Sequence, residues 1–148
     1  MEFVHQITAY LENKPGRLAK ICSSLAHEKV NIRALCVMEC DGRSVLRVVT
    51  DQIDAAGRIL TSLGTEHTVE DLLAVEIENK PGALAKVLER MADEHINIEY
   101  AYASNAVNGK ALGILHTSNP KKALQVLSES QSSAGADHSN GRRPLHSR

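Results

Sequence analysis

Two stretches of the chain carry the same pattern of apolar and polar positions, and each predicts a strand, a turn and a helix. Ile7–Leu11 and Leu73–Ile77 are strand-like runs, and each is followed by Asn-Lys-Pro-Gly. Apolar residues three and four positions apart come next, as on one face of a helix. These residues are Leu18, Ile21, Cys22 and Leu25 in the first copy and Leu84, Val87, Leu88 and Met91 in the second.

The two stretches are copies of one segment. Glu12–Leu35 and Glu78–Ala101 align without a gap at an offset of 66 residues and are identical at 12 of 24 positions. Internal similarity at a fixed offset identifies the folding unit. We therefore expect two modules, residues 1–70 and 71–130, followed by a tail, residues 131–148.

The same pattern predicts the rest of each module. Asn31–Cys40 alternates as a half-buried strand does, and Asp41-Gly42 then favours a tight hairpin turn, as Asn108-Gly109 does in the second copy. The remaining predicted elements are the return strands Ser44–Thr50 and Lys110–Thr117, one further helix in each module that Asp51 or Asn119 can cap, and a closing strand, Thr65–Glu70.

This order of elements, βαββαβ, predicts an α+β fold of two ferredoxin-like modules, each an antiparallel four-stranded sheet with two helices on one face. The second module has no counterpart of the closing strand, because Gln131–Arg148 is polar and has the composition of a disordered tail. Three explanations stay open: another chain supplies this strand, the sheet edge is left open, or the end of the sequence is shifted.

Composition narrows the function. The formal net charge is −1, with no Trp and one Phe, so the sequence does not indicate a nucleic-acid-binding surface. No signal peptide or run of 18 apolar residues is present, and we expect a soluble, cytoplasmic protein without a membrane partner. Cys22, Cys36 and Cys40 lack zinc-site spacing and are expected to be reduced thiols that serve as small core residues.

The two turns also have a chemical interpretation. A strand-to-helix turn with Pro at the start of the helix presents unpaired helix N–H groups, and these favour a carboxylate or phosphate. Glycine in such a turn allows a ligand to approach the backbone. The sequence thus predicts an anion-binding position at each copy of Asn-Lys-Pro-Gly.

With these motifs, the sequence resembles the ACT-domain proteins, small ferredoxin-like modules that bind amino acids and regulate metabolic enzymes. Both copies match the family pattern of a turn Asn, Pro-Gly, Leu, and a later Val or Ile before Asn-Ile. The matching residues are Asn13, Pro15, Gly16, Leu18 and Val30-Asn31-Ile32, then Asn79, Pro81, Gly82, Leu84 and Ile96-Asn97-Ile98.

The resemblance implies a ligand site at the seam between paired modules. The turn Asn and Gly would touch the ligand, and the Asn that opens the second strand would reach it from the neighbouring module. The ligand-binding residues are predicted to be Asn13, Lys14, Pro15, Gly16, Arg17, Leu18 and Asn31 in the first copy and Asn79, Lys80, Pro81, Gly82, Ala83, Leu84 and Asn97 in the second.

Each of these residues also has a simpler structural role. Asn13 and Asn79 could cap helices, and Asn31 and Asn97 could simply end a helix and begin a strand. Lys14 and Lys80 could be solvated, as could Arg17, although an arginine there could also bind a carboxylate in a bidentate manner.

We therefore expect a non-catalytic amino-acid sensor that acts in a homodimer on a biosynthetic enzyme, with no metal or cofactor. The alternative is a structural assembly module that binds a partner enzyme without a ligand. A small enzyme of the acylphosphatase kind would need Arg17 and Asn31 in a phosphate loop, and an RNA-binding module would have only Tyr100 and Tyr102 for stacking. The seven histidines lack metal-ligand or catalytic spacing, and His116, at the end of an inner strand, is expected to be buried and neutral.

Overall fold

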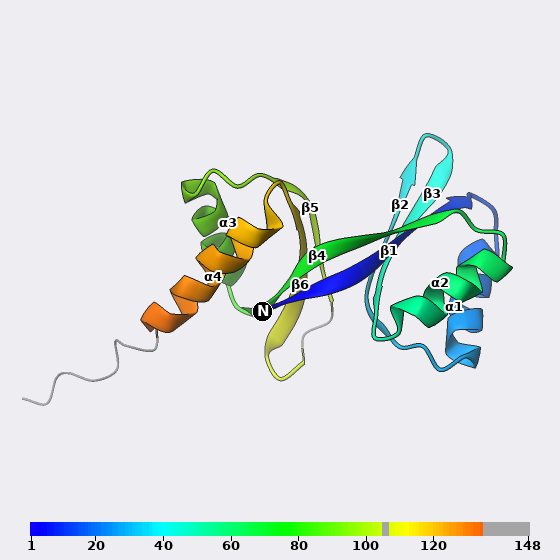
Figure 1. The fold of residues 1–148 in the computed structure, drawn as a ribbon, viewed down its shortest axis with the longest axis horizontal. Coiled ribbons are helices and arrows are strands. Elements are labelled where there is room, and N and C mark those ends of the chain that lie inside the picture. Colours follow the sequence, from blue (N-terminus) through cyan, green and yellow to red (C-terminus); the bar gives the residue numbers. More distant parts are fainter. Residues whose placement is uncertain (105–106, 135–148) are drawn as a thin grey trace, which may run out of the picture.

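The computed structural model describes residues 1–104 and 107–134 of the chain. Within these residues it contains strands and helices in the predicted order (Figure 1). They are β1 (Glu2–Glu12), α1 (Arg17–His27), β2 (Ile32–Cys40), β3 (Arg43–Thr50), α2 (Ile53–Ser62), β4 (His67–Glu78), α3 (Ala83–Asp93), β5 (Ile98–Ala103), β6 (Lys110–Thr117) and α4 (Pro120–Ala134).

The predicted α+β fold of two ferredoxin-like modules is confirmed, and the structure adds that their sheets are continuous. One antiparallel six-stranded sheet has the order β2-β3-β1-β4-β6-β5. The long strands β1 and β4 run side by side through its centre, with α1 and α2 at one end of the molecule and α3 and α4 at the other (Figure 1).

Strand β4 serves both modules. The sequence predicts two strands here, Thr65–Glu70 and Leu73–Ile77, but the structure has one strand of 12 residues from His67 to Glu78. Its first half pairs with β1 and closes the first module, and its second half pairs with β6 in the second module. The two modules therefore share a strand instead of being joined by a linker.

The start of β1 takes part of the place of the missing closing strand. Glu2–His5 pairs with Asp71–Ala74 of β4, on the side away from β6. Met1 packs against the core of the second module. Neither another chain nor a fully open edge is needed to explain the missing strand, because this chain supplies residues for that position itself.

The register makes the two halves equivalent. His5 pairs with Asp71, and the repeat offset of 66 residues relates these same two positions. His5 Nδ1 lies 2.6 Å from Asp71 Oδ1. The two modules are thus related by an approximate two-fold axis that passes between β1 and β4 at this pair.

Each module has its own core beneath its helices. Ile7, Ala9 and Leu11 of β1 pack with α1 and α2, whereas Leu73, Val75 and Ile77 of β4 pack with α3 and α4. Burial of such side chains contributes roughly 1.5–3 kcal/mol each to stability. Of the predicted apolar helix positions, Leu18, Ile21 and Leu25 of α1 and Val87 and Met91 of α3 belong to these cores, whereas Leu84 is 50% exposed.

A third core lies between the modules, on the sheet face opposite the helices. It contains Val4 of β1, Ala34 of β2 and Leu72 of β4, and Tyr100 and Tyr102 of β5 pack against it. The two edge strands β2 and β5 therefore lie close together, so the sheet curls until its ends face one another. Small side chains on β2 face the two tyrosines on β5.

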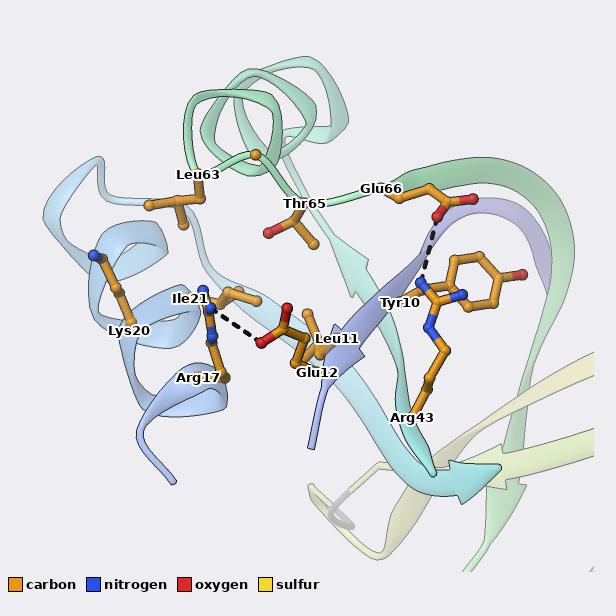
Figure 2. A pocket seen from close by; sticks show the side chains of 11 residues that line it. Tyr10, Leu11, Glu12, Arg17, Lys20, Ile21, Arg43, Leu63, Thr65 and Glu66 are labelled. Atoms are coloured by element: carbon orange, nitrogen blue, oxygen red, sulfur yellow. Dashed lines mark hydrogen bonds and ion pairs between the residues drawn. The ribbon is translucent and has the colours of Figure 1, made fainter. Parts of the chain in front are cut away.

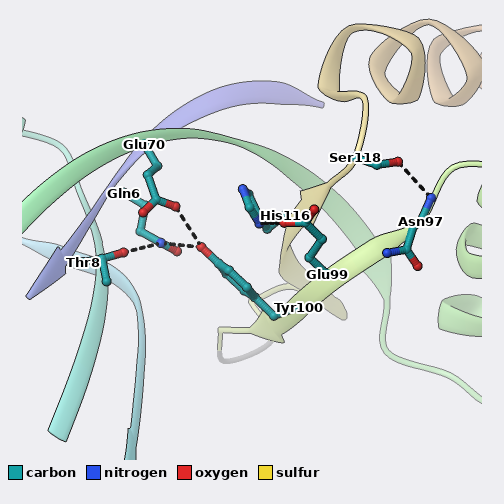
Figure 3. A network of polar contacts seen from close by, with 8 residues as sticks. All are labelled: Gln6, Thr8, Glu70, Asn97, Glu99, Tyr100, His116 and Ser118. Atoms are coloured by element: carbon teal, nitrogen blue, oxygen red, sulfur yellow. Dashed lines mark hydrogen bonds and ion pairs between the residues drawn. The ribbon is translucent and has the colours of Figure 1, made fainter. Parts of the chain in front are cut away.

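A buried polar network crosses this third core (Figure 3). Gln6 is fully buried and its Nε2 donates to Tyr100 Oη at 2.8 Å and to Thr8 Oγ1 at 3.0 Å. Tyr102 Oη donates to Gln6 Oε1 at 2.7 Å, and Tyr100 Oη donates to Glu70 Oε2 at 3.2 Å. One glutamine of β1 thus holds both tyrosines of β5.

The network gives stability a predicted dependence on alkaline pH. Burial raises the pKa of Tyr102, and burial also raises the pKa of Tyr100. A raised pKa in the folded state means that its stabilising contribution is complete below the ordinary pKa of about 10 and is lost as pH rises above it. We expect the free energy of unfolding to fall above about pH 10, and Tyr102→Phe to reduce that slope in urea titrations at several pH values. An unchanged slope in Tyr102→Phe would contradict this.

Several local predictions can be compared with the structure. Asp41 and Asn108 have φ of 52°, and Gly42 and Gly109 follow with φ of 76° and 74°, as the two hairpin turns require. Asn119 Oδ1 caps α4 by accepting from Lys122 N, at 3.1 Å. Asp51 does not cap α2, because it accepts a hydrogen bond from Asn31 N instead.

Two further expectations differ from the structure. Cys40 is exposed instead of being a core residue. Helix α4 continues through residues 131–134, which the composition assigned to a disordered tail, and the rest of that predicted tail lies outside the described residues.

Candidate functional site

The two Asn-Lys-Pro-Gly turns join β1 to α1 and β4 to α3 in the same conformation. Gly16 and Gly82 are the N-cap residues, each with φ of 85°, a value that favours glycine. The prolines precede these caps, so they lie before the helices and not in the first helical turn as predicted. The conformation of the turn therefore depends on the glycine.

Both helices begin without a side-chain cap. In α1 the N–H groups of Leu18 and Ala19 have no acceptor among the described residues, and in α3 the same holds for Leu84 and Ala85. A capping role for the turn asparagines is therefore not observed. Free N–H groups at a helix start favour negative charge.

The turn lysines are exposed to solvent, in agreement with their simpler expected role, and each forms an ion pair with a glutamate at the surface. Lys14 Nζ lies 2.9 Å from Glu12 Oε2, and Lys80 Nζ lies 2.5 Å from Glu78 Oε2. In each copy the hydrogen bond from the lysine lowers the pKa of the glutamate. The Glu-Asn-Lys sequence thus neutralises its own charge at the surface, which leaves the helix start as the polar feature of each turn.

The two turns do not face one another. They follow the ends of β1 and β4, and these strands are antiparallel, so the turns lie at opposite ends of the strand pair (Figure 1). The cavities described below are each lined by one turn at most. Within the single chain the two turns therefore do not meet at one seam.

Beside the first turn lies a charged groove of about 280 Å³ (Figure 2). It lies between α1 and the connection from α2 to β4. Arg17 at its wall is held by Glu12, at 3.4 Å, and Arg43 by Glu66, also at 3.4 Å. Arg17 is therefore partly neutralised by this chain, and Asn13 does not line the groove.

Beside the second turn lies a different cavity of about 320 Å³, which we call the second-turn pocket. Its walls are mostly apolar and come from the end of β4, the turn, the start of α3, β5 and β6. It is lined by Ile77, Glu78, Asn79, Lys80, Leu84, Ala101, Tyr102, Ala103, Ala111, Gly113 and Leu115. Small-molecule sites in proteins are commonly apolar hollows of roughly 300–1,000 Å³ with a few polar groups, and this pocket fits that description.

A third cavity, of about 620 Å³, lies between the modules and is called the intermodule groove. Asn31 and Arg33 of the first module line it together with Glu76 and Lys110 of the second. Asn31 therefore lies beside residues of the second module, but it does not line the second-turn pocket. Asn97 lines none of the three cavities, and its backbone N–H donates to Ser118 Oγ at 3.1 Å (Figure 3).

The structure therefore divides the predicted site residues into separate places. The first turn, Asn13–Gly16, stands exposed, with Arg17 in the charged groove and Leu18 packed against the first core. The second turn provides Asn79, Lys80 and Leu84 to the second-turn pocket, and Ala83 packs against the second core. Pro81 and Gly82 shape that turn but do not line the pocket.

Sequence reasoning missed the four small residues of the pocket wall, Ala101, Ala103, Ala111 and Gly113. A signal was present in the alternation Tyr-Ala-Tyr-Ala at residues 100–103. Alternation places the tyrosines on one face of β5 and the alanines on the other. The absence of large side chains on the helix-facing side of this strand predicts a hollow.

His116, on β6, lies beside Tyr100, which packs against the third core. Its ring stacks on Tyr100 with centroids 4.7 Å apart, and its Nδ1 lies 2.7 Å from Glu99 Oε2 (Figure 3). It is partly exposed, so the expectation of a buried histidine is not met. In the described part of the chain, no group of three His, Cys, Asp or Glu side chains is placed to hold a metal ion.

Comparisons with known proteins agree with this architecture. A family model described as an ACT domain pair matches residues 2–139. No curated protein matches the sequence. Among solved structures, protein BT0572 from Bacteroides thetaiotaomicron is 35% identical, with a TM-score of 0.81, over 87% of this chain and 89% of that chain.

Two more distant structures share the fold. The regulatory subunit of aspartate kinase from Thermus thermophilus, in a ligand-free form, is 19% identical with a TM-score of 0.66, over 86% of this chain and 94% of that chain. The corresponding subunit from Thermus flavus is 17% identical with a TM-score of 0.57, over 88% and 94%.

The continuous sheet and the glycine-capped turn in each half define a tandem pair of ferredoxin-like modules. The chain belongs to the ACT domain pair family, whose model covers nearly its whole length.

Proposed function

We propose that this protein binds a free amino acid at its second turn and regulates a partner enzyme, without catalysing a reaction itself. The observation that carries the proposal is the second-turn pocket, an apolar hollow beside a helix start with free N–H groups. An amino acid needs both features, because its carboxylate requires donors and its side chain requires a pocket. At the first turn the free N–H groups are also present, but the adjoining groove is lined by charged side chains instead of apolar ones.

In this proposal each end of the ligand has a defined partner. Its carboxylate accepts from the N–H groups of Leu84 and Ala85, which lie at the positive end of the α3 dipole. Its ammonium group donates to the amide oxygen of Asn79. Gly82 allows the carboxylate to approach, since a Cβ at this position meets no atom within 4 Å and would point into open space.

Binding of the ligand can affect the arrangement of the two modules, because the pocket lies at the end of a strand that both modules share. Ile77 and Glu78 of the pocket wall end β4, and β4 pairs with β1 and β6. A ligand that binds one arrangement of the modules more tightly than another shifts the population towards that arrangement. A partner that distinguishes the two arrangements is then regulated by the ligand.

The proposed partner is an enzyme of amino-acid biosynthesis in the cytoplasm. Support comes from the fold shared with proteins named as regulatory subunits of aspartate kinase. No helix among the described residues is long and apolar enough to cross a membrane. We also propose a homodimer, because the edge strand β2 exposes Leu35, Val37 and Met38, and such apolar surface favours association.

Calorimetric titration of the twenty amino acids into the protein tests the proposal. We expect at least one to bind with a dissociation constant below 1 mM, which corresponds to about −4 kcal/mol or better. If none binds at that level, the amino-acid sensor is rejected, and the alternative of an assembly module that binds an enzyme without a ligand is favoured.

Two matched glycine substitutions test the position of the site. Gly82→Ala and Gly16→Ala each place a side chain at φ of 85° with no atom within 4 Å, so both should cost about 1 kcal/mol of stability. We expect only Gly82→Ala to weaken amino-acid binding, by about tenfold or more, because its Cβ enters the space of the carboxylate. An equal loss of affinity in both variants would mean that the ligand is not specific to the second turn. A loss of affinity in Gly16→Ala alone would place the ligand at the first turn.

A further inference from the structure

The groove beside the first turn is lined by other residues than the second-turn pocket, although the turns themselves are nearly identical. The strand register identifies which residues correspond. Val37 pairs with Leu46 in the first module, and Ala103 pairs with Gly113 at the corresponding place in the second. Leu35 pairs with Val48, and Ala101 pairs with Leu115.

The residues at these positions differ in size in a consistent direction. On the helix-facing side, β2 carries Leu35 and Val37 where β5 carries Ala101 and Ala103. Gly113 replaces the fully buried Leu46, and Ile77 lies so close that a Cβ on Gly113 would be 2.6 Å from Ile77 Cδ1. At residues 101 and 103 the second module therefore carries less side-chain volume than the first, whereas the space beside Gly113 is filled by Ile77.

The helix side of the hollow differs in the same way. Leu18 packs against the core of the first module, whereas Leu84, its equivalent, is 50% exposed and lines the second-turn pocket. Leu84 therefore faces Ala101 and Ala103 across the pocket. An apolar side chain of a ligand would cover the apolar surface that these residues leave exposed. Each such group contributes roughly 25 cal/mol per Å² that it removes from water.

The polar groups of the pocket wall do not suit a charged side chain. Glu78 and Lys80 are paired with each other, and the hydroxyl of Tyr102 donates to Gln6. A carboxylate or ammonium group on the ligand side chain would lose its hydration here without gaining a partner, which is costly. The volume of about 320 Å³ suits a single small molecule.

We infer that the second-turn pocket selects an amino acid with an aliphatic side chain, and that the chain binds one such ligand, in the second module only. This inference rests on the proposed function and adds to it the ligand class and the stoichiometry. The ligand side chain lies against Ala101 and Ala103, beneath Leu84. The first turn keeps the same backbone, but the groove beside it is lined by charged side chains that include Arg17 and Arg43.

The test compares amino acids and two variants that exchange the residues of the modules. Leucine, isoleucine, valine and methionine are titrated by calorimetry, alongside serine, aspartate and lysine. We expect an aliphatic amino acid to bind at least tenfold tighter than any of the polar three, with one site per chain. Ala103→Val, which copies the first module, should weaken that binding at least tenfold, and Ala101→Leu should do the same.

The control is Val37→Ala, the reverse exchange at the equivalent exposed position of the first module, and it should leave the affinity unchanged. Thermal unfolding of all three variants verifies that they are folded. If one of the two pocket variants does not fold, the other still tests the inference. Tighter binding of serine, aspartate or lysine, two sites per chain, or full affinity in both pocket variants would overturn the inference while leaving the proposed function intact. Binding of no amino acid would overturn both.

Discussion

Val4→Asp is expected to lower the free energy of unfolding by about 4 kcal/mol, because it places an unpaired carboxylate inside the core between the modules. Val4 is 5% exposed and packs with Leu72, Ala74 and Ile114. Urea unfolding at neutral pH, followed by circular dichroism, measures the loss.

The control for this substitution is Val69→Asp. Val69 lies on the same pair of central strands but is 52% exposed, so the new carboxylate stays in water and should cost about 1 kcal/mol or less. Similar losses in the two variants would mean that the start of β1 does not pack against β4 and β6. The conclusion that the start of β1 lies in the core between the two modules would then be wrong.

Gln6→Ala should be nearly as damaging, with an expected loss of about 3 kcal/mol. The substitution removes the acceptor of Tyr102 Oη and the donor to Tyr100 Oη, and both tyrosines are partly buried. A buried polar group left without a partner costs about 1–3 kcal/mol, and the space left by the side chain adds to this. Because the network joins β1 to β5, the variant should also unfold less cooperatively.

Gln52→Ala is the corresponding control, since Gln52 is exposed and makes a single long hydrogen bond of 3.4 Å to Lys29 O. It should cost about 0.5 kcal/mol or less. A small effect of Gln6→Ala in the same urea titrations would show that water can replace the glutamine, and that the network does not hold the modules together.

The local structure was predictable from the sequence because local rules determine it. Gly16 and Gly82 supply the positive φ that starts each helix, and Asp41-Gly42 supplies the hairpin turn. The repeat itself identified the two modules, since duplicated segments fold alike. None of these features depends on which distant strands meet.

The continuous sheet was harder to predict because it depends on long-range pairing. Thr65–Glu70 and Leu73–Ile77 were expected to be separate strands, yet no glycine, proline or asparagine lies between them to break the backbone. Asp71 bonds His5 across the strand pair, so the chain passes from one module to the next without a turn. The lack of turn-forming residues between the two expected strands therefore indicated that they form one strand.

The candidate site was predicted in part. The motif led to both turns, but it could not show that they lie at opposite ends of two antiparallel strands. It also treated the copies as equal, although Leu35 and Val37 differ from Ala101 and Ala103 in size. Only the register shows that these residues occupy equivalent positions beside equivalent turns.

A crystal structure of the full chain grown with saturating leucine tests the central claim most directly. The account predicts one ligand per chain, with its carboxylate at the N–H groups of Leu84 and Ala85 and its side chain against Ala101 and Ala103. The first turn, Asn13–Gly16, should remain without ligand. Leucine bound at the first turn or in the intermodule groove, or an empty second-turn pocket at a concentration that saturates the protein in calorimetry, would contradict it.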